Sequence, residues 1–237
     1  MLALQHFDTL QLLALAAALG FASGLRLYAV LFIVGGIGYL GLVELPSGLN
    51  ILMHPFVLAA SGFMCFVEFF ADKIPGVDSL WDVVQTFVRV PAGAALAAGV
   101  FGDASSASML AAGILGGTLA AGSHLAKTGS RAVINTSPEP FSNWAASFGE
   151  DLAVGVVLWL AWSYPIVALA VLAVAVLFML WLLPRVFRLI RRFLDRLAAM
   201  LGVAERRSRP TDRSEDAMPP GGQRPTAASG GSPRETT

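Results

Sequence analysis

The chain has 237 residues, of which 56% are hydrophobic and 14% are charged. Because a soluble domain carries about 25% charged residues, this composition excludes an ordinary soluble domain and indicates a membrane protein. The net charge of zero hides an asymmetry: residues 1–184 contain ten acids and five bases, whereas residues 185–237 contain eleven arginines and six acids. The single cysteine, Cys65, excludes an intrachain disulfide and a thiolate metal cluster.

Two short apolar segments open the chain. Thr9–Ala22 is shorter than the ~20 residues that a spanning helix needs, and Leu27–Val43 follows a break of small residues that ends at Arg26. Two interpretations are open: two short spans around a tight turn at Arg26, or one long helix interrupted near it. We favour two spans, because an unpaired arginine in the middle of a bilayer is costly.

Five further apolar segments predict membrane-spanning helices. They are Leu52–Asp72, Ser79–Phe101, Ala107–Ala126, Trp144–Trp162 and Ile166–Leu183. Ala107–Ala126 is dense in Gly and Ala. Because small residues let helices approach closely in lipid, we expect this segment at the centre of the bundle. The last is nearly pure Ala, Val and Leu and is expected to face lipid. Residues 1–184 are therefore predicted to form an all-α, polytopic transmembrane helical bundle of about six to seven spans, with loops that include Glu44–Asn50 and the polar segment Lys127–Asn143.

The chain after Pro184 differs in composition. Residues 185–203 place apolar and basic residues on different sides of a helix, which is typical of a basic amphipathic helix on an anionic membrane surface. Five arginines are expected to contact anionic lipid headgroups: Arg185, Arg188, Arg191, Arg192 and Arg196. Residues 204–237 are rich in Pro, Gly, Ser and Arg and are predicted to be a disordered tail. Since basic residues favour the cytoplasmic side, the C-terminus and the connections that carry the bases of the bundle are expected in the cytoplasm.

The most informative segment is Phe63–Pro91, where ionisable groups interrupt an apolar stretch. It contains four acids and two bases: Glu68, Asp72, Lys73, Asp78, Asp82 and Arg89. The acids form two pairs with a spacing of four residues, so each pair shares one helix face. A hairpin would bring the four carboxylates together, and such an oxygen-rich cluster suits Mg²⁺, Ca²⁺, Mn²⁺ or a proton relay. The alternative is an ion-pair network that joins two spans.

Other charged residues could join this site. Glu150 and Asp151 are adjacent carboxylates that are costly to bury unpaired; they either join the site or stabilise the amino terminus of a helix. Three bases are, like Arg89, candidate partners for these acids or for a lipid phosphate: Arg26, Lys127 and Arg131. The alternative for them is anchoring on the cytoplasmic side. His124 fits either a proton carrier or a hydrogen-bonded buried histidine.

Three segments resemble a known family. They are ASGLRLYAVLF (residues 22–32), VEFFADKIPGVDSLWDVVQTFVRVPAGA (residues 67–94) and AAGSHLAKTGSRAVINTSPEPFSNWAASFGED (residues 120–151). Together they are similar to the bacterial integral-membrane family known as domain of unknown function 4126, and the order of acid, Ile-Pro, Val-Asp, Asp and Pro in the middle segment is the most specific part. The resemblance implies a multi-pass protein of the bacterial plasma (inner) membrane and no established activity.

These observations lead to two functional hypotheses of different classes. The first is a small-ion transporter, for a cation or coupled to protons, or a channel-like permease, with the carboxylates as its gate or coordinating cluster. The second is a non-enzymatic membrane protein that binds anionic lipid headgroups or scaffolds partners. The sequence contains no Gly-rich phosphate loop, HExxH motif or nucleophile elbow, so we expect neither an enzyme nor a cofactor, and no nucleic-acid partner.

Overall fold

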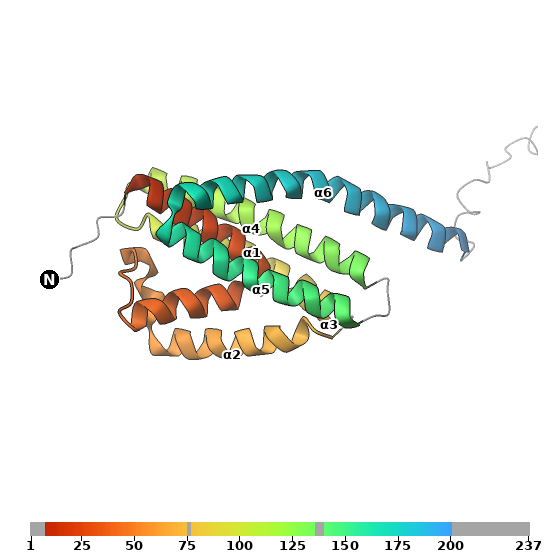
Figure 1. Cartoon of the computed structure of the whole chain (residues 1–237), viewed down its shortest axis with the longest axis horizontal. Helices are drawn as coiled ribbons and strands as arrows, with labels where there is room; N and C mark the ends of the chain where they lie inside the picture. The colour runs from red at the N-terminus through yellow and green to blue at the C-terminus, as the bar shows by residue number, and fades with distance from the viewer. Residues whose placement is uncertain (1–7, 75–76, 136–139, 201–237) are drawn as a thin grey trace, which may run out of the picture. The chain divides into compact units, whose positions relative to one another are not determined.

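A computed structural model describes residues 8–74, 77–135 and 140–200, and all its regular elements there are helical. The chain divides into two units, residues 1–193 and 194–237, and the described part of the second unit is the end of the last helix. In chain order the helices are α1 (Thr9–Tyr39), the 3₁₀ helix η1 (Ser47–Met53), α2 (Pro55–Ala71), α3 (Val77–Val100), α4 (Ser106–Ile134), α5 (Pro140–Ser163) and α6 (Pro165–Met200). Figure 1 shows the bundle that they form.

Most of these helices have the length and composition of membrane spans. Among the described residues, five helices qualify: α1, α3 from Leu80, α4, α5 from Phe141 and α6 as far as Arg185. The pair η1 and α2, bent by 70°, is a sixth candidate. The predicted all-α, multi-pass bundle is therefore confirmed.

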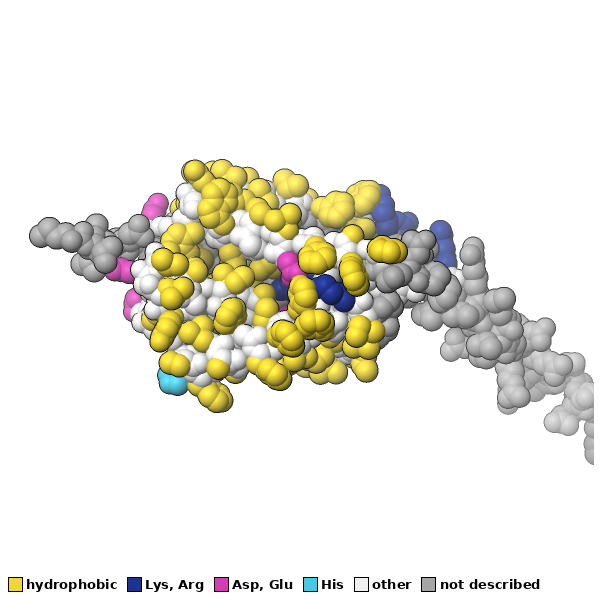
Figure 2. Space-filling view, turned by 60° about the horizontal axis from the view of Figure 1, so that its bottom comes forward, with side chains coloured by type: hydrophobic (Ala, Val, Ile, Leu, Met, Phe, Trp, Pro, Cys, Tyr) yellow, Lys and Arg dark blue, Asp and Glu magenta, His cyan; other side chains and the backbone are white. Residues whose placement is uncertain are grey.

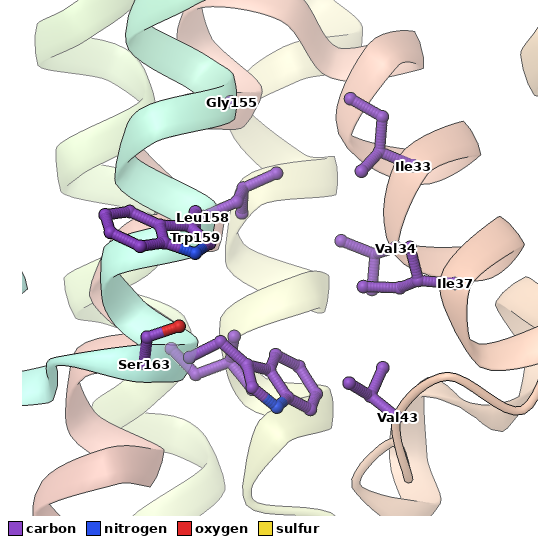
Figure 3. A pocket seen from close by; sticks show the side chains of 10 residues that line it. Ile33, Val34, Ile37, Val43, Gly155, Leu158, Trp159 and Ser163 are labelled. Carbon is purple, nitrogen blue, oxygen red and sulfur yellow. The ribbon is translucent and has the colours of Figure 1, made fainter.

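Helix α1 folds back on itself at Arg26. This residue has φ −145° and ψ 74°, which is not helical. Leu15 and Ile37 line one cavity, with Ile33 and Val34 beside them, although a straight helix would separate them by ~33 Å. Figure 3 shows Ile33, Val34 and Ile37 facing α5 across this cavity. The predicted turn at Arg26 is thus confirmed, and it divides α1 into two antiparallel limbs.

The apex of this fold-back lies inside the bundle rather than at its edge. Arg26 donates a hydrogen bond to Ser147, about two helical turns inside the start of α5. The first limb therefore runs toward Arg26 and the second limb runs back from it. Non-helical backbone at this depth is tolerated only where protein groups satisfy its polar atoms.

Glycines allow the first limb to press against α4. A Cβ added to Gly20 would lie 2.6 Å from Cα of Gly116, and one added to Gly24 would lie 2.0 Å from Oγ of Ser123. Helix α4 packs against α3, α1 and α5, as expected for a central helix that is rich in small residues.

Two predicted boundaries are wrong. Lys127 and Arg131 lie on α4, which continues to Ile134 rather than ending before a polar loop, because both side chains find carboxylate partners inside the bundle. Part of the predicted loop Glu44–Asn50 belongs to η1. The basic segment is the continuation of α6, which runs through Pro184 without a break.

The outer surface of the bundle is largely apolar. In α6, 17% of the residues in the most apolar stretch are buried, against 67% in α1, so α6 is far more exposed, as the prediction of a lipid-facing last span requires. Figure 2 shows hydrophobic side chains over most of one face, with a small group of charged side chains among them. Four arginines of the α6 extension are exposed: Arg185, Arg188, Arg191 and Arg192. The side chain of Arg196 and the tail 204–237 lie outside the described residues.

The buried charged residues gather at one end of the bundle, as the sequence predicted. The fold-back of α1, the end of α2, the start of α3, the end of α4 and the start of α5 all lie toward the right-hand end in Figure 1. The second limb of α1 and helices α3 and α5 end at the opposite end.

Candidate functional site

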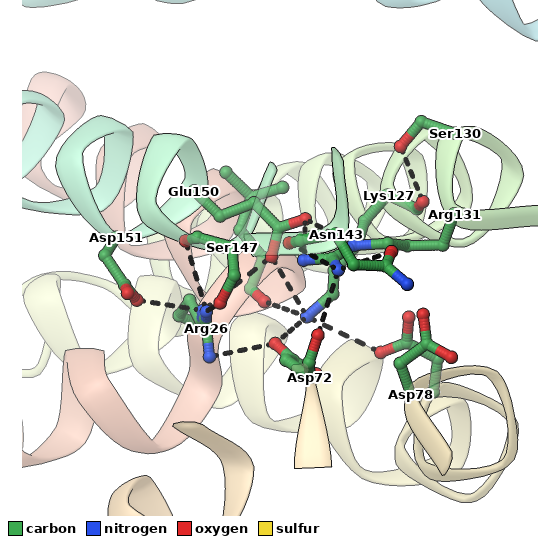
Figure 4. Close-up of polar contacts among 12 residues, drawn as sticks. Arg26, Asp72, Asp78, Lys127, Ser130, Arg131, Asn143, Ser147, Glu150 and Asp151 are labelled. Atoms are coloured by element: carbon green, nitrogen blue, oxygen red, sulfur yellow. Dashed lines mark hydrogen bonds and ion pairs between the residues drawn. The ribbon is translucent and has the colours of Figure 1, made fainter. Parts of the chain in front are cut away.

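Nine ionisable side chains at this end form one connected group, here called the ion network. Its acids are Glu68, Asp72, Asp82, Glu150 and Asp151, and its bases are Arg26, Arg89, Lys127 and Arg131. They come from α1, α2, α3, α4, α5 and the residue that follows α2. Figure 4 shows most of them pointing toward one another from separate helices. The predicted convergence of distant charges is therefore observed.

Arg89 joins α3 to α2. Its guanidinium pairs with Glu68 through Nη2, and its Nη1 lies 3.0 Å from Oδ1 of Asp82. All three side chains are buried. Removing one partner of a buried pair leaves an uncompensated charge, at a cost of about 3–5 kcal/mol, so this trio holds the two helices together.

His124 is neutral, because its neighbours fix its tautomer. Nη1 of Arg89 lies 3.1 Å from Nδ1 of His124, and a guanidinium can only donate, so Nδ1 accepts. Nε2 lies 2.7 Å from Oγ1 of Thr86, whose hydroxyl donates to the carbonyl of Asp82 at 2.9 Å. Nε2 therefore carries the hydrogen. This arrangement matches the hydrogen-bonded buried histidine that the sequence left open.

Lys127 occupies the centre of the ion network. Its Nζ lies 2.8 Å from Oδ2 of Asp72, 3.3 Å from Oε2 of Glu150 and 3.6 Å from Oδ1 of Asp82. It also donates to the carbonyl of Leu25 at 3.2 Å. A single ammonium thus connects four elements of the bundle.

Arg26, at the apex of the fold-back, connects α1 with α2 and α5. Its Nη1 lies 2.8 Å from Oδ2 of Asp72, and its Nε lies 3.0 Å from Oδ1 of Asp151. Nη2 donates to Oγ of Ser147 at 2.6 Å. The arginine that would be costly unpaired in the bilayer therefore forms ion pairs with acids from two other elements.

Arg131 connects α4 with α5. Its Nη2 lies 3.1 Å from Oε1 of Glu150, and Nη1 donates to Oδ1 of Asn143 at 3.2 Å and to the carbonyl of Asp72 at 3.0 Å. Glu150 lies well inside α5, which begins at Pro140. The alternative role for Glu150 and Asp151, stabilising a helix amino terminus, is therefore wrong.

Side chains from α3 and α4 satisfy the carbonyl groups that the turn in α1 releases. Ser123 donates to the carbonyl of Phe21 at 2.7 Å, and Lys127 donates to that of Leu25. Nη1 of Arg89 lies 3.5 Å from the carbonyl of Gly24. The two bases thus bind backbone dipoles and carboxylates together, which couples the shape of the fold-back to the ion network.

The ion network is unbalanced in charge and in hydrogen bonds. Five carboxylates face four bases when all are ionised. Among the described residues, four carboxylate oxygens of the network are buried without a hydrogen-bond partner: Glu68 Oε2, Asp72 Oδ1, Asp82 Oδ2 and Glu150 Oε2. The last of these still forms ion pairs with Lys127 and Arg26. A buried acceptor without a donor is costly, so these oxygens are suited to receive a proton or a cation.

Two of the predicted site residues lie at the edge of the ion network. Both carboxylate oxygens of Asp78 accept from Asn135 at 3.0 Å, and Asn135 in turn accepts from Asn143 at 2.7 Å. Nζ of Lys73 lies 3.0 Å from the ring centroid of Phe69 and donates to the Phe69 carbonyl at 3.1 Å. Lys73 is therefore held by the ring and the backbone of Phe69 rather than by an ion pair of the network.

Two groups just beyond α2 have shifted pKa values. For Asp72, burial opposes ionisation, but the positive charges of Lys127 and Arg26 outweigh it and lower its pKa below the usual range. For Lys73, partial burial and the nearby Arg26 lower the pKa of its ammonium. The carboxylate of Asp72 is therefore suited to bind cations at neutral pH.

The expected cluster for a hard divalent cation is not observed. Among the described residues, no group of three or more His, Cys, Asp or Glu side chains could hold a metal ion. The carboxylates converge, but bases stand between them, because each acid pairs with an arginine or with Lys127. The described residues therefore do not support the oxygen-rich interpretation for Mg²⁺, Ca²⁺ or Mn²⁺.

Sequence reasoning missed the uncharged polar residues of the site. Asn143, Ser147 and Asp151 follow one another at intervals of four on α5, and Ser123, Lys127 and Arg131 do the same on α4. Such a polar stripe at helical spacing marks one face of an otherwise apolar helix. It could have identified Asn143 and Ser147 in advance.

The fold and the ion network together define the class: a multi-pass α-helical membrane protein with a buried ion-pair network around the fold-back of α1. The model of the family described as domain of unknown function (DUF4126) matches residues 13–185, and the chain belongs to this family. The resemblance seen in the three sequence segments is thereby confirmed. No curated protein and no solved structure matches the chain.

Proposed function

We propose that this protein is a proton-coupled transporter of a small ion, in which the ion network binds and releases the proton. One observation carries the proposal. Glu68, Asp72 and Asp82 are each fully buried, and each pairs one oxygen with a base while the other oxygen has no hydrogen-bond partner. Ionisable residues inside a membrane bundle are expensive and commonly mark an ion or proton path.

A proton fits this network better than a divalent metal does. The network carries one more acid than base, and its free acceptors are spread over separate side chains. A proton needs a single carboxylate oxygen, whereas Mg²⁺ or Ca²⁺ needs six or more oxygens around one point.

Protonation of Glu68 would change the contact between two helices. A proton on its free oxygen neutralises the carboxylate and weakens the ion pair with Arg89. Arg89 would keep Asp82 and would hold α2 less tightly. Such a change at the fold-back, whose Gly24 carbonyl lies within reach of Arg89, could alternate access between the two ends of the bundle.

The test is proton flux in proteoliposomes that contain the full chain. A potassium diffusion potential drives protons, and a trapped pH-sensitive dye reports the flux. We expect measurable flux for the native protein, a loss of at least about tenfold in Glu68→Gln, and unchanged flux in Asp103→Asn, which removes an exposed acid at the opposite end. Circular dichroism confirms that both variants are folded. Equal rates in native protein, Glu68→Gln and empty liposomes would refute the proposal.

A second candidate function, binding of anionic lipid, rests on different residues. The four buried bases of the ion network bind the chain's own carboxylates, whereas Arg185, Arg188, Arg191 and Arg192 are exposed on α6. Each basic residue near an anionic leaflet contributes about 1 kcal/mol of attraction. This proposal places the α6 extension on the cytoplasmic side of a bacterial plasma membrane. Native mass spectrometry of the native chain and of a variant with these four arginines changed to Gln tests it: retention of anionic phospholipid should fall, and equal retention would refute it.

A further inference from the structure

The ammonium of Lys127 lies in a cage of oxygen atoms from four separate elements. The cage consists of Asp72 Oδ2, Asp82 Oδ1, Glu150 Oε2 and the carbonyl oxygen of Leu25, at 2.8 to 3.6 Å from Nζ. An ammonium has three donors, so four oxygens exceed what it can bind. We call this group the cation cage.

The acids of the cation cage have partners besides Lys127. An arginine binds each of them: Arg26 binds Asp72, Arg89 binds Asp82 and Arg131 binds Glu150. Because these contacts come from α1, α3 and α4, they would keep the acids in place without the lysine. The second oxygens of Asp72 and Asp82 are also buried and have no hydrogen-bond partner.

We propose that the cation cage is a binding site for a free monovalent cation of ammonium size, which competes with the side chain of Lys127. The proposal deepens the proposed function, because it identifies the class of cation that would be coupled to the proton. The distances of 2.8 to 3.6 Å suit a large monovalent cation and exceed the 2.0–2.6 Å that Mg²⁺ and Ca²⁺ require.

Electrostatics favour replacement of the Lys127 ammonium by a free cation over a cage that holds no cation. With Lys127 in place, five acids face four bases, and without it they face Arg26, Arg89 and Arg131 alone. The deficit of positive charge then grows from one to two. His124 is neutral and Lys73 contacts Phe69, so neither supplies the missing charge. The flexible four-carbon stem of lysine allows its ammonium to leave while a cation enters.

The experiment measures binding of ammonium chloride to the purified full chain by calorimetry and by thermal unfolding. Tetramethylammonium chloride at equal ionic strength is the control salt, because its cation is too large for the cage. In Lys127→Met the tethered competitor is gone, so we expect the apparent Kd for ammonium to fall at least about tenfold relative to the native protein. Lys73→Met, which removes a neighbouring amine outside the cage, should bind as the native protein does.

A second variant tests whether the cage itself holds the cation. Adding Glu150→Gln to Lys127→Met removes one of the oxygen charges and should reverse the gain in affinity. Equal responses of Lys127→Met to the two salts, or the same gain in Lys73→Met, would overturn the proposal.

Folding of the variant gives a further criterion. If Lys127→Met is recovered only in ammonium chloride, the proposal is supported. If neither it nor Lys127→Gln is recovered with or without ammonium, the cage does not accept a free cation in place of the tethered one. Proton flux without ammonium binding would refute this inference alone, and ammonium binding without proton flux would refute the proposed function alone.

Discussion

The two ends of the bundle differ in chemistry although the same helices form both of them. At one end, α5 directs Asn143, Ser147 and Glu150 into the ion network; at the other, Leu158 and Trp159 of the same helix line an apolar cavity of about 290 Å³. The cavity is lined mostly by apolar side chains, and any apolar side chain can make the dispersion contacts found there. The ion network, in contrast, depends on particular atoms at particular distances. Substitutions at the charged end should therefore have large, specific effects, and those at the apolar surface should have small ones.

The largest loss of stability is expected from Arg89→Ala. This change leaves Glu68 and Asp82 buried without their base, and we expect the free energy of unfolding to fall by about 3–5 kcal/mol. Unfolding by SDS in mixed micelles measures it. Arg185→Ala, at an exposed arginine, is the matched control. A loss under about 1 kcal/mol in Arg89→Ala would show that the trio does not hold α2 to α3.

The close contact between α1 and α4 should produce the next largest effect. A Cβ at Gly20 meets the backbone of Gly116, so Gly20→Ala should cost about 1–3 kcal/mol through overpacking. Gly36 has open space at the same position, and Gly36→Ala should be neutral or stabilising by up to about 1 kcal/mol, since alanine favours a helix. The same SDS titration compares them, and equal effects of the two substitutions would contradict the close approach.

Acidification should weaken the ion network through Asp72. Its pKa is lowered in the folded state, so its ion pairs contribute stability above the ordinary aspartate pKa of about 4. That contribution is lost as the pH falls through the lowered value. We expect Asp72→Asn to be less stable at neutral pH and to lose less stability on acidification. Asp103→Asn should keep the native pH dependence, and identical curves for all three proteins would be evidence against the role of Asp72.

The smallest effect is expected on the surface of α6. The guanidinium of Arg185 lies 3.6 Å from the ring centroid of Trp181, and an exposed cation–π contact contributes about 0.5–1 kcal/mol. Trp181→Leu should therefore change the unfolding free energy by that amount or less. An effect as large as that of Arg89→Ala would show that the two regions do not differ as described.

The sequence was sufficient to predict an all-helical, multi-pass bundle and the gathering of charges at one end. Hydropathy located the helices, and the spacing of Glu68 and Asp72 indicated a shared face. The sequence could not assign the ion-pair partner of each charged residue, because a pair such as Lys127 with Asp72 joins residues far apart in the chain. The end of α4 was misplaced for the same reason, since charged residues extend a buried helix only when acids from other helices meet them. The pairing of the carboxylates with bases, where the sequence suggested a site for a divalent cation, likewise depends on tertiary packing.

The most direct test of the central claim is an infrared difference spectrum recorded as the pH of the purified native protein is lowered. If the ion network takes up a proton on Glu68, the spectrum gains the carbonyl stretch of a protonated carboxylic acid. That band should be missing from Glu68→Gln and present in Asp103→Asn. An unchanged band in Glu68→Gln would contradict the account.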